Sequence, residues 1–393
     1  MKNMEIQMKK TDYRFSDHII SAIIPVYNAE DSICNALDSI KKQDIKDVEI
    51  VIVNDGSTDR TAIEVLSYMD RNPNMDILYI SQENSGPGAA RNIGLNYASG
   101  RYISFLDSDD FIPKHAYRQF INVVNKWNCD VVIGSYMRRI DDGSWYVPQE
   151  IKKICEDNDG KNLAGEYPVV IKNPSLWNRL YRREFLEKNN IRFLNENHGE
   201  DVIFNLDVIR CAEKVYTTDS VCYYYSKREN KRDSVSTSWS EKNTLSHIRA
   251  ISTYMLYFDG IGDVYSEAIY LRTEITYLMN GIRTVEDRTE RNNLYECIMR
   301  ELKKYIGNKK YEDFISNLLG VDLETAVLVP FDVYLMYKQL NWQQKAAAPS
   351  NNAAGQQLQN NKEVVLQQFA KGQIGFKYIL KYIKAWIKFK IFH

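Results

Sequence analysis

Residues 48–60 read VEIVIVNDGSTDR, and this short stretch decides the class of fold. Its first part is almost continuously apolar and rich in β-branched side chains, which is typical of a strand buried on both faces of a parallel sheet. The polar residues that follow, including Asp55 and Gly56, end the strand in a turn. The stretch therefore indicates an α/β protein whose strand ends carry polar groups.

Other stretches between residues 19 and 135 have the same character, and helix-like segments separate them. The further strand-like stretches cover 19–26, 76–81, 101–106 and 130–135. The segments between them carry apolar residues at helical spacing and begin with capping residues or with proline. Strands that alternate with helices predict right-handed βαβ units around an open, mostly parallel central sheet.

Composition places the chain among ordinary globular proteins and narrows its partners. It has 393 residues, with 51 Lys+Arg against 52 Asp+Glu, so any electrostatic function must be local and nucleic acid is not an expected partner. The six cysteines form no C-x-x-C pair, which argues against a zinc or redox motif. Because the sequence carries neither a signal peptide nor an apolar run long enough to span a bilayer, we expect a cytoplasmic protein.

Changes of pattern along the chain predict five parts. We expect an N-terminal extension at 1–18, the α/β domain at 19–240 and a helical domain at 241–340. A flexible linker rich in Gln, Asn and Ala follows at 341–370, and a basic amphipathic helix at 371–393. The helical domain could support a homo-oligomer, but the sequence does not determine the oligomeric state.

The last segment, 371–393, contains six lysines and no acidic residue. Four of the lysines fall on one helical face, and Phe376, Trp386 and isoleucines line the other. This pattern fits the surface of an anionic membrane, which would place the protein peripherally on the inner face of the membrane. A helix docked on this protein or on a partner is the alternative.

The polar strand ends predict a ligand site, because ligands of open parallel sheets bind beyond the carboxyl ends of the strands. The sequences at these ends are PVYNAED, NDGSTD, QENSGPGAARN and DSDDF. An EF-hand is excluded, since counting from Asp107 puts Ile112 and Arg118 where calcium loops need Gly and Glu. The GPGAAR stretch lacks the third glycine of a dinucleotide fingerprint and does not follow the first strand, and the chain has no P-loop.

A nucleoside diphosphate with a divalent ion fits these residues better. The Asp-x-Asp pair of Asp107 and Asp109 offers hard oxygen ligands that suit Mg²⁺ or Mn²⁺. The carboxylate of Asp55 can accept the imino N–H of uracil, although thymine and guanine present the same group and a helix cap is the structural alternative. Arg91 can supply a forked donor to phosphate or to a base carbonyl.

The stretches AIIPVYNAEDSICNALDSI, EIVIVNDGSTDRT and NSGPGAARNIGLNYASGRYISFLDSDD, together with a later GED, resemble the family 2 glycosyltransferases of GT-A fold. The resemblance covers roughly residues 19–240. It implies inverting transfer of a sugar from a UDP-sugar with Mn²⁺ or Mg²⁺. By matching position, it implies that the nucleoside is held by Pro25, Tyr27 and Asp55, the base and phosphates by Asn84 and Arg91, the ribose or sugar by Asp107 and Ser108, and the metal by Asp109.

The same resemblance implies that Asp201 is the catalytic base, with Glu200 beside it binding the acceptor or positioning the base. A carboxylate at the start of a helix is also favoured by the helix dipole, so a purely structural role is the alternative. Trp177 could stack on an acceptor sugar or lie in the core. Arg232 and Ser236 belong to a basic loop that could close over the diphosphate or remain solvated.

These features together predict a metal-dependent transferase acting in polysaccharide biosynthesis. We expect it to move a hexose or N-acetylhexosamine from a UDP-sugar to a hydroxyl of a surface glycan acceptor that is linked to lipid. Transfer onto a protein acceptor and a non-catalytic nucleotide- or glycan-binding module are the alternatives. A sugar nucleotidyltransferase is disfavoured, because PVYNAED has no glycine after the first strand. The sequence does not identify the sugar or the linkage.

Overall fold

A computed structural model describes residues 7–11, 18–45, 47–140, 142–166, 169, 173–194, 199–226, 240, 243–249 and 274–303. It also describes residues 315, 316, 319, 323–326, 328 and 334. The chain divides into two compact units, one comprising 1–238 with 249–270 and the other 239–248 with 271–393. The division into domains that the sequence predicts stays a prediction. The linker at 341–370 and the basic helix at 371–393 lie outside the described residues.

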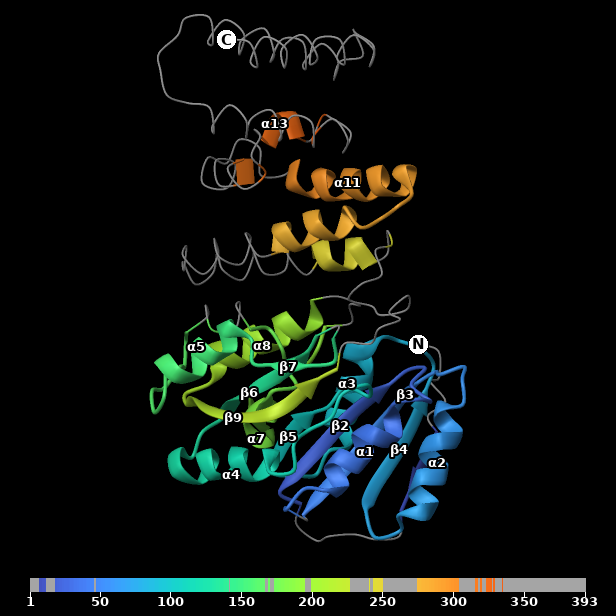
Figure 1. The fold of residues 1–393 in the computed structure, drawn as a ribbon, viewed down its shortest axis with the longest axis vertical. Helices are drawn as coiled ribbons and strands as arrows, with labels where there is room; N and C mark the ends of the chain where they lie inside the picture. The colour runs from blue at the N-terminus through green and yellow to red at the C-terminus, as the bar shows by residue number, and fades with distance from the viewer. Residues whose placement is uncertain are drawn as a thin grey trace, which may run out of the picture. The chain divides into compact units, whose positions relative to one another are not determined.

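One mixed sheet of nine strands organises the first unit (Figure 1). Its strands are β1 (Gln7–Lys10), β2 (Ile20–Val26), β3 (Val48–Asp55), β4 (Asp76–Gln82), β5 (Tyr102–Phe105), β6 (Val131–Arg139), β7 (Trp145–Tyr146), β8 (Arg179–Arg182) and β9 (Val215–Tyr225). They run in the order β1-β4-β3-β2-β5-β8-β6-β7, and β9 pairs with β6. The strands predicted between 19 and 135 are confirmed as β2 to β6.

Strand direction explains where polar groups can gather. Strands β4, β3, β2 and β5 are mutually parallel. Val51 of β3 pairs with Ile23 of β2 on one side and with Leu78 of β4 on the other. Strand β8 is antiparallel to both β5 and β6, so β6 and its parallel partner β9 run in the same direction as β5. The carboxyl ends of six strands therefore lie along one edge of the sheet, which we call the carboxyl edge.

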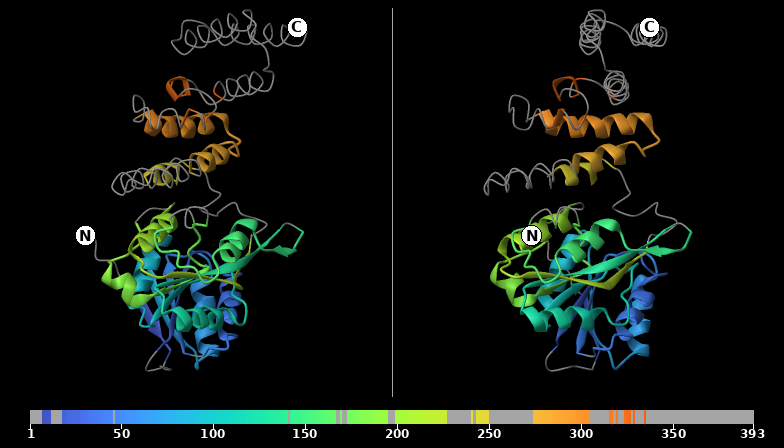
Figure 2. Two further views of the ribbon diagram at one scale, coloured as in Figure 1. Left: turned by 90° about the vertical axis from the view of Figure 1, so that its left-hand side faces the viewer. Right: turned by 60° about the vertical axis from the view of Figure 1, so that its left-hand side comes forward.

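Helices cover both faces of the sheet, as the nearly continuous apolar strands require. The helices of the first unit are α1 (Ile33–Lys41), α2 (Thr61–Arg71), α3 (Pro87–Tyr97), α4 (Ala116–Trp127), α5 (Gln149–Asp157), α7 (Arg183–Lys188) and α8 (Glu200–Cys211). Alternate residues of β2 point to opposite faces: Ala22 and Ile24 share a core with α1, α2 and α4, whereas Ile23 meets Gly94 of α3. Figure 2 shows α4 below the sheet and α5 and α8 above it.

The second unit is helical in the residues that the structure describes. It contains helical segments at 243–248 and 274–282, α11 (Arg288–Leu302) and α13 (Leu323–Ala326). Asp287 caps α11, because its side chain accepts a hydrogen bond from the main-chain N–H of Glu290 at 2.7 Å. Tyr295 and Tyr334 stack with ring centroids 5.3 Å apart. Across the described part of the chain, no helix is both long and apolar enough to cross a bilayer.

Candidate functional site

The first two loops of the carboxyl edge are tied to each other by polar contacts. Asn28 follows β2 with φ +46°, a conformation that asparagine tolerates better than most residues. Its main-chain N–H donates to Oγ of Ser57 at 3.0 Å, and its Oδ1 accepts from the N–H of Thr58 at 2.9 Å. Pro25, the second-last residue of β2, is half-buried. Tyr27 follows the strand directly and is 50% exposed. The pairing leaves an exposed aromatic ring at the carboxyl edge.

Asp55 ends β3 and is buried, yet its carboxylate retains capacity for one more partner. Oδ1 accepts from Nε2 of Gln82 at 2.6 Å and from the N–H of Ser85 at 2.8 Å. Oδ2 accepts from the N–H of Gly86 at 2.8 Å. Each carboxylate oxygen can accept about two hydrogen bonds, so among described residues Oδ2 has one acceptor position left. Gln82, which fixes Oδ1, is a site residue that sequence reasoning missed.

The turn after β3 approaches the loop after β4 closely. Gly56 has φ +72°, and a Cβ there would lie 2.8 Å from the main-chain nitrogen of Asn84. Only glycine fits this position without moving that loop. Asn84 itself is exposed, so the structure brings it to the edge beside Asp55 and leaves its side chain open to solvent.

Arg91 joins two carboxylates that lie far apart in the sequence. Nη2 donates to Oδ1 of Asp107 at 2.9 Å, and Nη1 donates to Oε1 of Glu200 at 3.0 Å. Arg91 belongs to α3 and its side chain is buried. Its Cζ lies 5.6 Å from the centroid of the Phe193 ring. The predicted role of Arg91 in holding base or phosphate stays a prediction, but its forked donors are already used within the protein.

The acidic cluster after β5 is stabilised by protein groups from distant segments. Asp107 is held by Arg91, and its main-chain N–H donates to the hydroxyl of Tyr223 at 3.2 Å. Asp110 is buried, and accepts from the Tyr223 hydroxyl at 2.8 Å and from the main-chain N–H of Ser226 at 2.6 Å. Burial, with Asp109 and Asp107 nearby, raises the pKa of Asp110 well above its usual range. Sequence reasoning gave neither Asp110 nor Tyr223 this role.

Ser108 and Asp109 are half-buried at the same edge, and the side chain of Asp107 is 27% exposed. Oδ2 of Asp107 accepts no hydrogen bond from a described residue. Two partly exposed carboxylates in an Asp-x-Asp arrangement fit a Mg²⁺ or Mn²⁺ ion whose other ligands are diphosphate oxygens and water. In the part of the chain that the structure describes, no group of three or more His, Cys, Asp or Glu side chains could hold a metal alone. A divalent ion held by Asp107 and Asp109 would therefore need further ligands from outside this set of side chains.

The start of α8 brings the predicted base to this edge. Gly199 precedes the helix with φ +74°, and the Oδ1 of Asp201 accepts from the N–H of Val202 at 2.7 Å. Asp201 is half-buried and Glu200 is buried. Burial, followed by the neighbouring Asp201, raises the pKa of Glu200 to about 8, although Arg91 lowers it. Of the two adjacent carboxylates, Asp201 is therefore the more accessible.

Trp177 lies in an aromatic cluster at the β6–β9 side of the edge. Its ring stacks on Tyr223 at 4.2 Å and on Tyr225 at 5.6 Å, and Tyr136 contacts it edge-on at 4.8 Å. The ring is half-buried, so its predicted contact with an acceptor sugar stays a prediction. Arg232 and Ser236, the other weak candidates, lie outside the described residues.

Arg179 is a buried cation that the sequence analysis did not single out. Nη2 donates to the carbonyl of Asn173 at 2.5 Å, whereas Nε and Nη1 have no hydrogen-bond partner among described residues. Burial lowers the pKa of Arg179, and Tyr181 and Asp201 oppose that shift. Arginine nevertheless stays protonated in proteins, so a fixed positive charge acts on Asp201 from the protein interior. An arginine at the start of the short, otherwise largely apolar strand RLYR was the available sequence signal.

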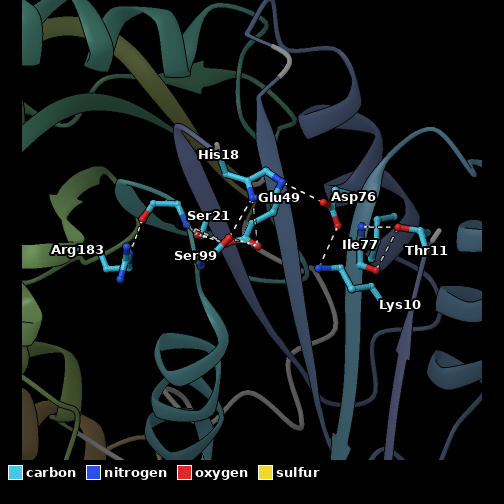
Figure 3. A network of polar contacts seen from close by, with 10 residues as sticks. Lys10, Thr11, His18, Ser21, Glu49, Asp76, Ile77, Ser99 and Arg183 are labelled. Carbon is cyan, nitrogen blue, oxygen red and sulfur yellow. Dashed lines mark hydrogen bonds and ion pairs between the residues drawn. The ribbon is translucent and has the colours of Figure 1, made fainter. Parts of the chain in front are cut away.

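A second polar network lies at the opposite edge of the sheet (Figure 3). The His18 ring contacts Oδ2 of Asp76 at 2.9 Å and lies 3.7 Å from Oε2 of Glu49. Glu49 also accepts hydrogen bonds from Ser21 and Ser99. These groups are buried and bind one another, so this network connects the starts of β2, β3 and β4 and has a structural role.

Comparison with known proteins gives a family for the part of the chain that contains this site. Residues 21–189 match the model of glycosyl transferase family 2. The chain is 34% identical over 239 residues to glycosyltransferase GlyA of Streptococcus pneumoniae, and 31% identical over 218 residues to the glycosyltransferase EpsJ of Bacillus subtilis. These matches cover 58% and 54% of this chain, but 32% and 62% of the relatives. The chain thus spans less than two thirds of the length of these curated relatives.

A third relative links sequence and structure. The chain is 30% identical over 215 residues, 54% of its length, to the poly(ribitol-phosphate) beta-N-acetylglucosaminyltransferase TarS of Staphylococcus aureus, covering 36% of TarS. The crystal structure of TarS 1–349 in complex with UDP-GlcNAc matches with a TM-score of 0.60 at 23% identity, over 79% of this chain and 90% of that chain. The predicted mixed α/β fold of GT-A type is confirmed by this similarity.

Proposed function

We propose, from the match of residues 21–189 to glycosyl transferase family 2, that the chain is a member of this family and transfers a hexose or N-acetylhexosamine from a UDP-sugar to a hydroxyl of a surface glycan. The reaction inverts the anomeric centre. Asp107, Ser108 and Asp109 serve the donor and its metal ion, and Asp201 is the general base.

One observation carries this proposal. The guanidinium of Arg91 contacts Asp107 of the Asp-x-Asp loop at 2.9 Å and Glu200, the neighbour of Asp201, at 3.0 Å. Donor ligands and the predicted base therefore lie within reach of one side chain, although Arg91 and Glu200 are 109 residues apart. A sheet without a ligand would not need to gather an Asp-x-Asp pair and a helix-terminal carboxylate in one place.

The donor fits the groups at the carboxyl edge. The remaining acceptor position on Oδ2 of Asp55 suits the imino N–H of uracil, with Tyr27 and Pro25 beside the base and Asn84 across the loop. Asp109 with Asp107 would hold Mn²⁺ or Mg²⁺ against the diphosphate. When bound, that ion would offset the negative charge that grows on the departing UDP. The UDP-GlcNAc in the structure of TarS supports a UDP-linked donor for a fold of this kind.

The base chemistry follows from the placement of Asp201. An acceptor hydroxyl is a poor nucleophile, so a carboxylate within hydrogen-bond reach must take its proton as the oxygen attacks the anomeric carbon. The positive end of the α8 dipole and the buried charge of Arg179 both attract a negative charge at Asp201. Attack from the face opposite to UDP inverts the anomeric centre, by the geometry known from inverting glycosidases.

The relatives and the end of the chain bear on the acceptor and on the location of the protein. The name of TarS describes a poly(ribitol-phosphate) acceptor, which supports a polymer of the cell surface as acceptor here, linked to a lipid carrier during synthesis. The lysine-rich segment 371–393 would hold the enzyme at the inner face of an anionic membrane, where such an acceptor lies.

The proposal is tested by incubating the purified chain with UDP-sugars and measuring UDP release with and without acceptor. Asp201→Asn should lower turnover at least about 100-fold, because general-base catalysis contributes roughly 10²–10⁴-fold. Asp207→Asn is the matched control, since Asp207 lies on the same helix and pairs with Arg210 at 2.9 Å at the surface. It should leave turnover unchanged.

Two results would count against parts of the proposal. If Asp201→Asn kept wild-type turnover, Asp201 would not be the base. If peptides were glycosylated and lipid-linked glycans were not, the acceptor would be protein. Binding of UDP-sugars without any turnover would support a non-catalytic binding module.

A further inference from the structure

Arg91 has little capacity left for a ligand in this structure. Its Nη1 and Nη2 donate to Glu200 and Asp107, the side chain is 7% exposed, and Phe193 covers one face of the guanidinium. Only Nε has no partner among described residues, and that nitrogen is buried. Each Nη carries a second N–H, but with the side chain 7% exposed little of the guanidinium is open to a diphosphate.

The helix that carries Arg91 is fixed to the segment leading into α8. Asn92 donates to the carbonyl of Phe193 at 2.9 Å and accepts from the N–H of Phe193 at 2.9 Å. A Cβ at Gly88 would lie 2.6 Å from the carbonyl oxygen of Leu194 and 3.3 Å from Cγ of Glu200. Contacts from Gly88, Arg91 and Asn92, within little more than one turn of α3, therefore hold this helix against the segment.

We propose that Arg91 is a positioning residue that couples the Asp-x-Asp loop to the base-bearing start of α8, and that it does not bind the donor diphosphate. The inference rests on the proposed glycosyl transfer. Nη2 of the guanidinium fixes the orientation of Asp107. Nη1 fixes the position of Glu200 and thereby that of the first turn of α8. Donor and base groups are then held in a fixed relation before either substrate arrives.

The two possible roles of Arg91 make opposite predictions for lysine. A phosphate ligand tolerates lysine, because an ammonium is a good point-charge partner for phosphate. A bridge does not, because lysine lacks the planar fork that reaches two carboxylates on opposite sides. Arg91→Lys should therefore lower kcat at least about 30-fold, since misplacing catalytic groups by about 1 Å costs roughly 100-fold. UDP affinity, measured by calorimetry, should stay within about threefold of wild type, because Asp109 and the base-binding groups remain.

A double-mutant cycle tests the coupling itself. Arg91→Met removes and Glu200→Gln weakens the same contact, so kcat of the double variant should lie within about threefold of the slower single variant. Arg183→Met is the control, because Arg183 donates to the carbonyl of Gly100 at 2.7 Å and pairs with Glu187 away from the carboxyl edge. Arg183→Met should leave kcat unchanged. When it is combined with Glu200→Gln, the double variant should show the kcat of Glu200→Gln alone.

The outcomes separate this inference from the proposed function. The bridging role of Arg91 would be wrong if Arg91→Lys kept the wild-type kcat. It would also be wrong if the fold-losses in kcat of Arg91→Met and Glu200→Gln multiplied in the double variant. Neither result would contradict glycosyl transfer. If the wild type binds UDP but transfers no sugar, the proposed function fails, and amide hydrogen exchange still tests the bridge. UDP should then slow exchange in the first turn of α8 in the wild type and not in Arg91→Lys. Equal slowing in both would overturn the inference.

Discussion

Replacing Tyr223 by phenylalanine isolates the contact that holds the acidic loop in place. The Tyr223 side chain is fully buried, and its hydroxyl both accepts from the N–H of Asp107 at 3.2 Å and donates to Asp110 at 2.8 Å. The ring itself stacks on Trp177 at 4.2 Å, and phenylalanine preserves that stacking. Tyr223→Phe therefore removes one oxygen and leaves the packing unchanged.

The expected loss of stability follows from the two contacts. A hydrogen bond to a carboxylate contributes about 1.5–3 kcal/mol, and a neutral one about 0.5–1.5 kcal/mol. Asp110, whose pKa is raised by burial, would lose one of its two partners, and the N–H of Asp107 would lose its only described acceptor. Together these changes predict a decrease of about 2–4 kcal/mol in the free energy of unfolding, or roughly 5–12 °C in Tm for a unit of this size.

Urea unfolding, followed by tryptophan fluorescence, measures this loss. Tyr216→Phe is the matched control on the same strand, because its ring stacks on Trp127 at 4.7 Å and its hydroxyl has no hydrogen bond among described residues. The control should change stability by less than about 0.5 kcal/mol. If Tyr223→Phe were as stable as wild type, or no less stable than the control, the contact would not hold the acidic loop.

Three further predictions concern Glu200, α3 and the far edge of the sheet. Burial raises the pKa of Glu200 from 4.5 to about 8, so the folded chain keeps a proton that the unfolded chain loses. The free energy of unfolding should therefore fall as pH rises from about 4.5 to 8, and denaturation of Glu200→Gln across that window should show a smaller fall. Gly88→Ala should lower kcat about tenfold or more by pushing on Leu194, whereas Gly94→Ala should destabilise the core without that loss in steady-state assays. His18→Ala should lower stability in urea by about 1–3 kcal/mol, because it removes the ring that contacts the buried carboxylate of Asp76 at 2.9 Å, while UDP affinity should stay unchanged.

The parallel centre of the fold was predictable because each of its strands is buried on both faces. Such strands read as continuous apolar runs, and the helices between them show a clear period. Strand β1 (QMKK) is short and polar because it lies at a sheet edge, so it has no such signal. The β6–β9 pairing was missed for a different reason, since its register shifts around Ser135 interrupt the alternation of side chains.

The candidate site was predictable to the extent that strand ends determine it. The polar ends of β3 and β5 placed Asp55, Asp107 and Asp109 at one edge without any structure. The contacts that hold them come from segments over 100 residues away, such as Tyr223 for Asp107 and Glu200 for Arg91. Nothing in the local sequence of these residues specifies such pairings, because they depend on how β8, β9 and α8 fold back onto the edge.

The central claim is that the carboxyl edge binds a UDP-sugar through a metal ion held at Asp109. A thermal-shift panel of UDP, GDP and dTDP, each with and without Mn²⁺, tests it on the wild type and on Asp109→Ala. A ligand that binds only the folded state raises Tm by mass action. We predict stabilisation by UDP that requires Mn²⁺ and disappears in Asp109→Ala. A folded wild type that none of the nucleotides stabilises, or equal stabilisation of Asp109→Ala, would contradict the account.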